Sequence, residues 1–275
     1  MEQIGDASRD EAVGAIRRAY ADGPYGQIHY ARRGAGEPLL LLHQTPRSWD
    51  EYEKVMGLLP PSRLMLAIDL PGMGASDPPP GEPTIEAYAD AAVALLDGLG
   101  LPAAHVFGHH TGAFVAADLA ARHSGRVRSL MLSAPGWVDA QSRATPLDPS
   151  DLPVDNAQPS ADGAHLIELW RQREAFYPPD RADLLSVFMR DALRVADPRA
   201  GHVACARYAM DRAVERIACP ALLIAHGRDP HSIGDFGEFV QRLPDAVTVE
   251  IDGGMVPLEL EAARVAQAID DFLSR

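Results

Sequence analysis

Residues 104–112 read AHVFGHHTG, and this stretch decides how the rest of the chain is interpreted. An apolar run ends at Gly108, and a helical pattern (AFVAADLAARH) begins after Gly112. Glycines at these two positions permit a sharp strand-to-helix turn in which the backbones approach too closely for a Cβ atom. His110 is the middle residue of that turn. We expect it to be held in a strained, exposed conformation at the edge of a sheet.

Apolar runs with strand character recur on both sides of this turn and alternate with helical patterns. The runs cover residues 38–42 (PLLLL), 64–69 (LMLAID), 127–133 (VRSLMLS) and 220–226 (PALLIAH). Short strands separated by single helices are typical of βαβ units, which form parallel sheets. We therefore predict an α/β domain with a mostly parallel central sheet flanked by helices. Near the N-terminus, residues 11–20 have a short helical pattern.

The alternation stops between residues 135 and 215. Residues 140–160 are rich in Pro, Asp and Ser, whereas residues 163–176, 181–195 and 201–212 have the spacing of amphipathic helices. Because the strand pattern resumes at residue 220, we predict a helical cap, 135–215, inserted into a core made of 1–134 and 216–275.

The composition narrows the class of protein. A chain of 275 residues with 47% hydrophobic residues is long enough to bury the core of one large α/β domain. A net charge of −14 without a basic cluster argues against nucleic acid or an anionic membrane as partner. The N-terminus has no signal-peptide pattern, and no apolar run approaches the roughly 18 residues of a membrane span. We expect a cytoplasmic protein that acts on a small molecule, and the sequence indicates no particular oligomeric state.

Four motifs in the same chain order resemble the landmarks of the α/β-hydrolase superfamily. They are the segments 43–46 (HQTP), 69–77 (DLPGMGASD), 108–112 (GHHTG) and 226–230 (HGRDP). In that family they correspond to the oxyanion loop, a second glycine-rich loop, the nucleophile elbow and the loop that carries the acid of the triad. The resemblance extends over almost the whole chain. It implies the α/β-hydrolase fold, with an inserted helical cap.

Three positions depart from the family pattern. His110 stands where the family usually has a serine nucleophile, and Met255 stands where it has the catalytic histidine. Gln44 replaces a glycine in the oxyanion loop. The resemblance therefore implies the scaffold of a hydrolase but not an ordinary Ser-His-Asp mechanism.

His110 is the predicted catalytic residue, as general base or as nucleophile. A histidine with an unperturbed pKa of about 6.5 is mostly neutral at cellular pH and can accept a proton. The resemblance implies Asp229 as its acidic partner, with Asp139 as the alternative. The backbone N–H groups of Thr45 and Thr111 correspond to the family's oxyanion hole. Gln44 either adds an amide donor to that hole or only narrows the loop.

The remaining candidates are predicted by residue type and position. Polar and aromatic residues of the cap are candidate substrate contacts: His165, Trp170, Tyr177, His202 and Tyr208. We expect His43 and His109 to be structural. The ten histidines show no HxH or HExxH spacing, and the two cysteines form no CxxC motif, so we predict neither a metal site nor a cofactor.

These features predict a cofactor-independent enzyme acting on a small, partly apolar carbonyl compound. Hydrolysis of an ester, lactone or thioester is the first expectation, because it is the family's common reaction. Two alternatives stay open. One is a lyase, isomerase or cyclase that uses His110 as a general base, and the other is a catalytically silent protein that only binds a ligand.

Overall fold

The computed structural model describes residues 14–147, 159–195, 197 and 199–275. Within these residues, eight strands form one sheet in the order β1-β2-β4-β3-β5-β6-β7-β8. The strands are β1 (Arg17–Gly23), β2 (Gly26–Arg33), β3 (Glu37–Leu42), β4 (Arg63–Ile68), β5 (Ala104–His109), β6 (Val127–Ser133), β7 (Ala221–His226) and β8 (Val247–Ile251). The first two ladders, β1 with β2 and β2 with β4, are antiparallel, and all the others are parallel. The predicted α/β class is confirmed.

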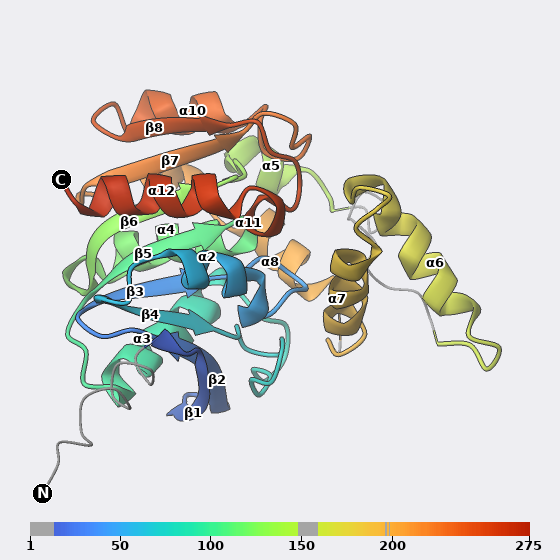
Figure 1. Cartoon of the computed structure of the whole chain (residues 1–275). Helices are drawn as coiled ribbons and strands as arrows, with labels where there is room; N and C mark the ends of the chain where they lie inside the picture. Colours follow the sequence, from blue (N-terminus) through green and yellow to red (C-terminus); the bar gives the residue numbers. More distant parts are fainter. Residues whose placement is uncertain (1–13, 148–158, 196, 198) are drawn as a thin grey trace, which may run out of the picture.

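Helices cover both faces of the sheet (Figure 1). One face carries α3 (Ile85–Gly98), α4 (Thr111–Arg122), α9 (Met210–Val214) and α10 (Phe236–Arg242). The other carries α2 (Glu53–Leu58), α11 (Pro257–Leu260) and α12 (Ala262–Leu273). Short 3-10 turns are η1 (Trp49–Tyr52), η2 (Ser124–Arg126) and η3 (Glu174–Phe176).

The position of strand β3 explains why its sequence is a continuous apolar run, because helices cover both faces of the sheet there. Successive side chains of a strand point to opposite faces of the sheet. Leu39 and Leu41 accordingly pack with α2 and α12, whereas Leu40 and Leu42 pack with α3 and α4. A strand that is covered on both faces has no position for a polar residue, and all four leucines are fully buried.

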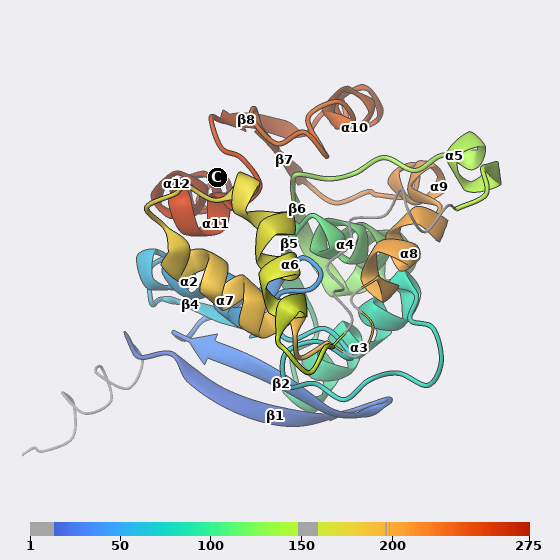
Figure 2. The ribbon, with the colours of Figure 1, turned by 90° about the vertical axis from the view of Figure 1, so that its right-hand side faces the viewer.

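Between β6 and β7 the chain forms a separate group of helices, α5 (Ala140–Ala144), α6 (Ala164–Arg173), α7 (Ala182–Ala192) and α8 (Ala200–Arg207), followed by α9. Helices α6 and α7 stand away from the sheet in Figure 1 and lie in front of it in Figure 2. Leu185 and Phe188 of α7 pack with Leu169 of α6 and with Val256, which precedes α11. This cluster fastens the inserted helices to the segment after β8.

Of the helix expected over residues 11–20, Gly14 is helical, but the prediction is wrong for residues 17–20. Residues 17–23 form β1, which pairs with β2 over its full length, from Arg17 opposite Arg32 to Gly23 opposite Gly26. The backbone hydrogen bonds of this hairpin outweigh the weak local helical preference. Residues 11–13 lie outside the described residues. The helix predicted over 201–212 is interrupted as well, because Tyr208 and Ala209 have non-helical backbone angles between α8 and α9.

Candidate active site

The turn between β5 and α4 is the strained elbow that the glycine spacing predicts. His110 has φ 46° and ψ −113°, a region that side-chain-bearing residues rarely occupy. A Cβ atom on Gly108 would lie 2.0 Å from the carbonyl oxygen of Gly112, and one on Gly112 would lie 1.8 Å from that of Leu42. Only glycine fits at these two positions. The turn is held by a hydrogen bond that the His110 N–H donates to the carbonyl oxygen of Ser133.

Asp229 lies against the imidazole of His110. Its Oδ2 atom is 3.0 Å from Nε2, and the carboxylate is fully buried in the loop after β7. The oxygen lies off the line of the ring N–H, so the two groups are in contact but form no aligned hydrogen bond, and they become an ion pair only when the imidazole is protonated. Burial raises the pKa of Asp229, but His110 and hydrogen bonds from Ser232 and the His231 backbone outweigh this and hold it at about 2. The carboxylate is therefore ionised at neutral pH.

The ionised carboxylate selects the tautomer of the neutral ring. A carboxylate beside Nε2 favours the form that carries its hydrogen on Nε2. The lone pair is then on Nδ1, the nitrogen nearer the backbone. In the serine-hydrolase triad the two nitrogens have the reverse roles, since the aspartate there faces Nδ1 and Nε2 is the base.

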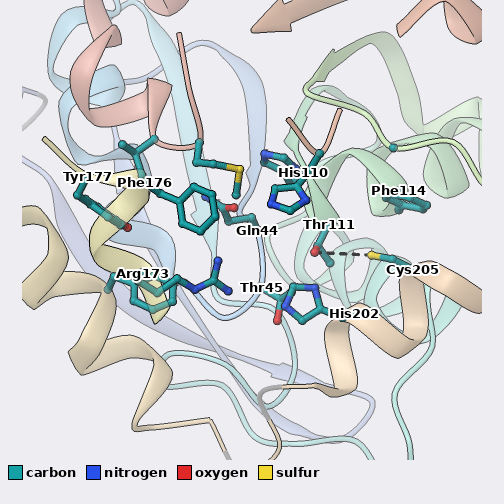
Figure 3. Close-up of a pocket in the computed structure, with 15 residues that line it drawn as sticks. Gln44, Thr45, His110, Thr111, Phe114, Arg173, Phe176, Tyr177, His202 and Cys205 are labelled. Carbon is teal, nitrogen blue, oxygen red and sulfur yellow. Dashed lines mark hydrogen bonds between the residues drawn. The ribbon is translucent and has the colours of Figure 1, made fainter. Parts of the chain in front are cut away.

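His110 faces a cavity of about 210 Å³ beneath the inserted helices (Figure 3). Polar residues of its wall are Gln44, Thr45, His110, Thr111, Arg173, Tyr177, His202, Cys205 and His231. The rest of the wall consists of Phe114, Gly136, Phe176, Phe188, Met255 and Val256. Such a mixture of apolar surface and a few convergent polar groups is typical of small-molecule sites. A cavity of 150 Å³ is known to hold benzene, so this one suits a somewhat larger molecule.

Both threonines of the predicted oxyanion hole line this cavity. Thr111 is the first residue of α4, where a backbone N–H has no intrahelical partner and points outward. Gln44 also lines the cavity, but its side-chain nitrogen and its backbone N–H both donate to the buried carboxyl group of Glu51. These bonds hold the amide nitrogen toward Glu51. They favour the interpretation that Gln44 only narrows the loop over the one in which it adds an amide donor to the oxyanion hole.

His43 and His109 lie beneath the site. The Nδ1 atom of His43 donates to the carbonyl oxygen of Gln44, and its Nε2 accepts from the N–H of Leu70. These bonds tie the loop after β3 to the loop after β4. His109 contacts the Ser133 hydroxyl, which also contacts His226. Burial lowers the pKa of all three imidazoles, to about 4 for His226. They are neutral at physiological pH.

Cys205 lines the cavity and donates its thiol hydrogen to Thr111. Burial raises its pKa to about 12. A thiolate, not a thiol, is the nucleophilic form of cysteine. Cys205 therefore does not replace the missing serine.

Two of the five predicted substrate contacts, Tyr177 and His202, line the cavity, and three do not. His165 lies in the first turn of α6, where its Nδ1 atom accepts a hydrogen bond from the backbone N–H of Ser160. Trp170 packs at the edge of the cluster of α6 and α7. Tyr208 is buried against α4 and donates to Asp118. These three residues were predicted from their residue types, but their side chains make contacts outside the cavity.

The structure also separates the two candidate acids. Asp139 caps the N-terminus of α5 by accepting from the backbone N–H of Ser142, whereas Asp229 is the carboxylate in contact with His110.

Several cavity residues were not predicted, and Arg173 is the most consequential. It is buried on α6 together with Leu169, four residues earlier, so the two side chains share the inner face of the helix. That spacing is the one signal in the sequence that could have pointed to Arg173.

Within the described ranges, no three histidine, cysteine or acidic side chains converge where they could hold a metal ion. None of the helices in this part of the chain is long and apolar enough to cross a membrane.

The comparisons with known proteins agree with this architecture. A family model described as alpha/beta hydrolase fold matches residues 37–218. The chain belongs to this family. The predictions of an α/β-hydrolase fold and of a hydrolase-type enzyme are thereby confirmed at the level of the family.

Individual relatives differ in how much of the chain they share. A pimeloyl-[acyl-carrier protein] methyl ester esterase of Neisseria meningitidis is 30% identical over 225 residues, which are 76% of this chain and 81% of that one. The dihydrolipoyllysine-residue acetyltransferase component of the acetoin cleaving system of Cupriavidus necator is 34% identical over 152 residues. That match spans half of this chain but only 40% of the relative. The enol-lactonase of Burkholderia xenovorans superposes with a TM-score of 0.74 at 19% identity, over 94% of this chain and all of that one.

Proposed function

We propose that this protein hydrolyses a small, partly apolar ester, lactone or thioester, with His110 as its general base. The observation that carries the proposal is the imidazole of His110, which stands at a strained elbow, faces the cavity and has an ionised carboxylate 3.0 Å behind it. Hydrolysis accords with the relatives, which include an esterase and a lactonase. The segment 135–215 is the proposed cap over this site.

In the proposed reaction, Nδ1 of His110 removes a proton from a water molecule that attacks the substrate carbonyl. The imidazolium formed in this step is stabilised by Asp229. The backbone N–H groups of Thr45 and Thr111 stabilise the negative charge that develops on the carbonyl oxygen. When this tetrahedral intermediate collapses, the bond between the carbonyl carbon and the leaving oxygen or sulfur breaks, and the imidazolium returns its proton to the leaving group. We favour this role over direct attack by histidine. Nδ1, the nitrogen with the lone pair, is bonded to the ring carbon Cγ that carries Cβ, and it is therefore the more hindered of the two nitrogens.

Proton abstraction without hydrolysis is the second candidate. The central position of the elbow offers a base but no hydroxyl, and Met255 lines the cavity where the family has its histidine. A base with an oxyanion hole suffices to remove a proton from carbon beside a carbonyl group, as in an elimination or isomerisation.

Kinetic assays on activated esters, lactones and thioesters test the role of His110. His110→Ala should lower kcat/KM by about 10²–10⁴-fold, the usual contribution of a general base. Asp229→Asn should lower it as well, and His123→Ala, which removes a surface histidine paired with Asp90, should leave it unchanged. Full activity in His110→Ala would refute the assignment.

Isotopic labelling separates the two candidate reactions. In ¹⁸O-labelled water, hydrolysis places the label in the carboxylic acid product. A reaction that only moves a proton leaves oxygen unlabelled and exchanges hydrogen with deuterated solvent instead. A protein that binds these compounds tightly and alters none of them would favour the silent ligand-binding alternative.

A further inference from the structure

The ring of Phe114 forms part of the cavity wall close to the elbow. Phe114 lies in the first turn of α4, four residues after His110, and its backbone N–H donates to the carbonyl oxygen of His110. Residues four apart lie on the same side of a helix, and four residues advance a helix by about 6 Å. A chain that extends along α4 from a carbonyl group held at His110 therefore reaches this ring after roughly that distance.

The cavity extends to both sides of His110. Figure 3 shows that Phe114 and Cys205 lie on one side of His110, whereas Tyr177 lies on the other. We refer to the first side as the Phe114 end. There the thiol of Cys205 is un-ionised, and Gly136, which lies against the ring, contributes no side chain. An aromatic ring, a neutral thiol and glycine backbone form a surface against which an alkyl chain is stabilised.

The position of the Phe114 ring depends on Gly136. A Cβ atom on Gly136 would lie 3.2 Å from two carbons of the ring, which is closer than most Cβ contacts in proteins. Tyr208 packs against the same ring with ring centres 6.1 Å apart. Only 5% of Phe114 is exposed. The glycine backbone and Tyr208 thus confine the ring at the end of the cavity.

The backbone at Gly136 is itself anchored. The next residue, Trp137, donates its backbone N–H to the carboxylate of Asp235 at 2.8 Å. Its indole packs edge-to-face on Phe239, with ring centres 5.3 Å apart. A methyl group added at residue 136 would therefore displace the ring of Phe114 before it displaced this backbone. The space that can take up the displaced ring is the cavity.

We propose that Phe114, held in place by Gly136, closes this end of the cavity and determines the longest alkyl chain that a substrate can carry beside its carbonyl group. This inference rests on the proposed function for the position of the reacting carbonyl at His110. Since a cavity of 150 Å³ holds the six carbons of benzene, one of about 210 Å³ has room for roughly eight non-hydrogen atoms. The substrate class is thus a short-chain acyl compound.

Binding of 2-alkanones tests this length limit without requiring catalysis, because a ketone has a carbonyl group but no leaving group. We would measure the affinities of the series from 2-pentanone to 2-undecanone for the full chain by calorimetry. Each methylene that passes from water to an apolar wall should raise the affinity about fourfold. In wild type this rise should stop near 2-heptanone, which fills the available space.

Substitutions at the two residues should move the limit in opposite directions. Phe114→Ala removes roughly the volume of benzene, part of which is lost as neighbouring side chains relax. The rise should then continue to about 2-nonanone, which should bind about 16-fold more tightly than it binds to wild type. Gly136→Ala pushes the ring into the cavity and should end the rise about one methylene earlier than in wild type.

Two further variants guard this comparison. Phe114→Leu is a milder change for the case in which Phe114→Ala fails to fold, and it should extend the limit by about one methylene. Phe272→Ala on α12, which packs on the opposite face of the sheet, is the matched control and should leave the limit at 2-heptanone.

The proposal is overturned if the limit stays at the wild-type length in both Phe114 variants, or if the affinity of wild type keeps rising beyond 2-nonanone. An unchanged limit in Gly136→Ala would refute the role of the glycine in holding the ring. A limit that moves equally in Phe272→Ala would show that the effect is not specific to Phe114.

Hydrolysis of vinyl esters keeps the two proposals distinguishable. Their alcohol part is small and constant, and the acyl chain is lengthened from acetate to octanoate. We expect the highest kcat/KM near the butanoate in wild type and near the hexanoate in Phe114→Ala. Ester turnover with the same optimum and the same ketone limit in both proteins rejects the chain-length role alone. A ketone limit that moves with residue 114, without turnover of any ester, rejects the hydrolytic function alone.

Discussion

Two clusters of buried polar groups lie beside the loop that follows β3, and they are built differently. Around Arg47, which is 1% exposed, the charges are paired: its guanidinium contacts Asp191 of α7 at 3.1 Å and Glu259 of α11 at 2.5 Å. Around His110, buried atoms on Thr45, His109, His110 and His226 have no aligned protein hydrogen-bond partner among the described residues.

We infer from this difference that the Arg47 cluster serves the fold and that the His110 cluster serves the proposed reaction. Buried polar groups in folded proteins are normally hydrogen-bonded, so a group of exceptions in one place needs a reason. In the Arg47 cluster the exception is a single oxygen, Oε2 of Glu259. In the His110 cluster the exceptions surround the cavity or lie directly beneath it. We infer that the first cluster joins inserted helix α7 to the core and that the second is arranged for a substrate.

The largest expected effect comes from breaking the Arg47 cluster. Arg47→Met leaves Glu51, Asp191 and Glu259 without their shared cation. Burial and the neighbouring Glu259 already raise the pKa of Glu51 to about 8 although Arg47 lowers it. Removing one partner of a buried ion pair typically costs about 3–5 kcal/mol, and we expect a loss of this size in the free energy of unfolding, measured in urea. Arg128→Met, which removes a surface pair with Glu37, is the control and should leave stability unchanged. Equal stability of both variants would mean that the Arg47 cluster is not structural.

The second-largest expected effect is a loss of stability at acidic pH, caused by the buried imidazole of His226. Burial, and after it His110, lowers the pKa of His226 to about 4 in the folded protein, against about 6.5 in the unfolded chain. Below pH 6.5 the unfolded chain therefore binds a proton that the folded protein does not bind until about pH 4. The free energy of unfolding should fall across this interval by on the order of 3 kcal/mol on account of this residue.

Urea unfolding at pH 7 and at pH 4.5 measures this contribution. His226→Asn should show a smaller difference between the two pH values than wild type. His123→Asn, at a surface histidine, should show the wild-type difference. If His226→Asn loses as much stability between pH 7 and pH 4.5 as wild type does, the buried imidazole is not the source of the acid sensitivity.

The smallest effect isolates the strain at the elbow. At φ 46° a glycine is unstrained, so His110→Gly should be more stable than His110→Ala by about 1–2 kcal/mol. Both variants lose the contact with Asp229, and that loss cancels in the comparison. In the middle of α4, Ala116→Gly should have the opposite sign and cost about 1 kcal/mol. If glycine also destabilises at residue 110, the elbow stores no strain.

The sequence could predict those parts of the structure that depend on local chain geometry. The glycines at 108 and 112 act within the turn that they form, and the apolar runs specify strands covered on both faces. The family resemblance predicted that Asp229 lies near His110. The strand order explains this proximity, since the carboxyl ends of parallel strands β5 and β7 meet at one edge of the sheet.

The inserted helices were predicted less well, because their inner faces depend on how they pack against the core. Tyr208 is aromatic and lies in the inserted segment, yet its hydroxyl contacts Asp118 of α4 and not the cavity. Arg173 reads as a surface residue by its charge, and only the packing of α6 turns it inward. The strand β1 was missed for a similar reason, since its partner β2 supplies the hydrogen bonds that stabilise it.

The hydroxyl of Ser133 links the two histidines beneath the elbow, 3.0 Å from Nδ1 of His109 and 2.8 Å from Nε2 of His226. A hydroxyl has one hydrogen, so it donates to one ring and accepts from the other. With both rings neutral, one must present an N–H and the other a lone pair, and the positions of their hydrogens are correlated. Reversing the hydroxyl would exchange the tautomers of both rings together. The imidazole of His109, 4.5 Å from that of His110 between ring centres, thus has a tautomer tied to that of a residue on another strand.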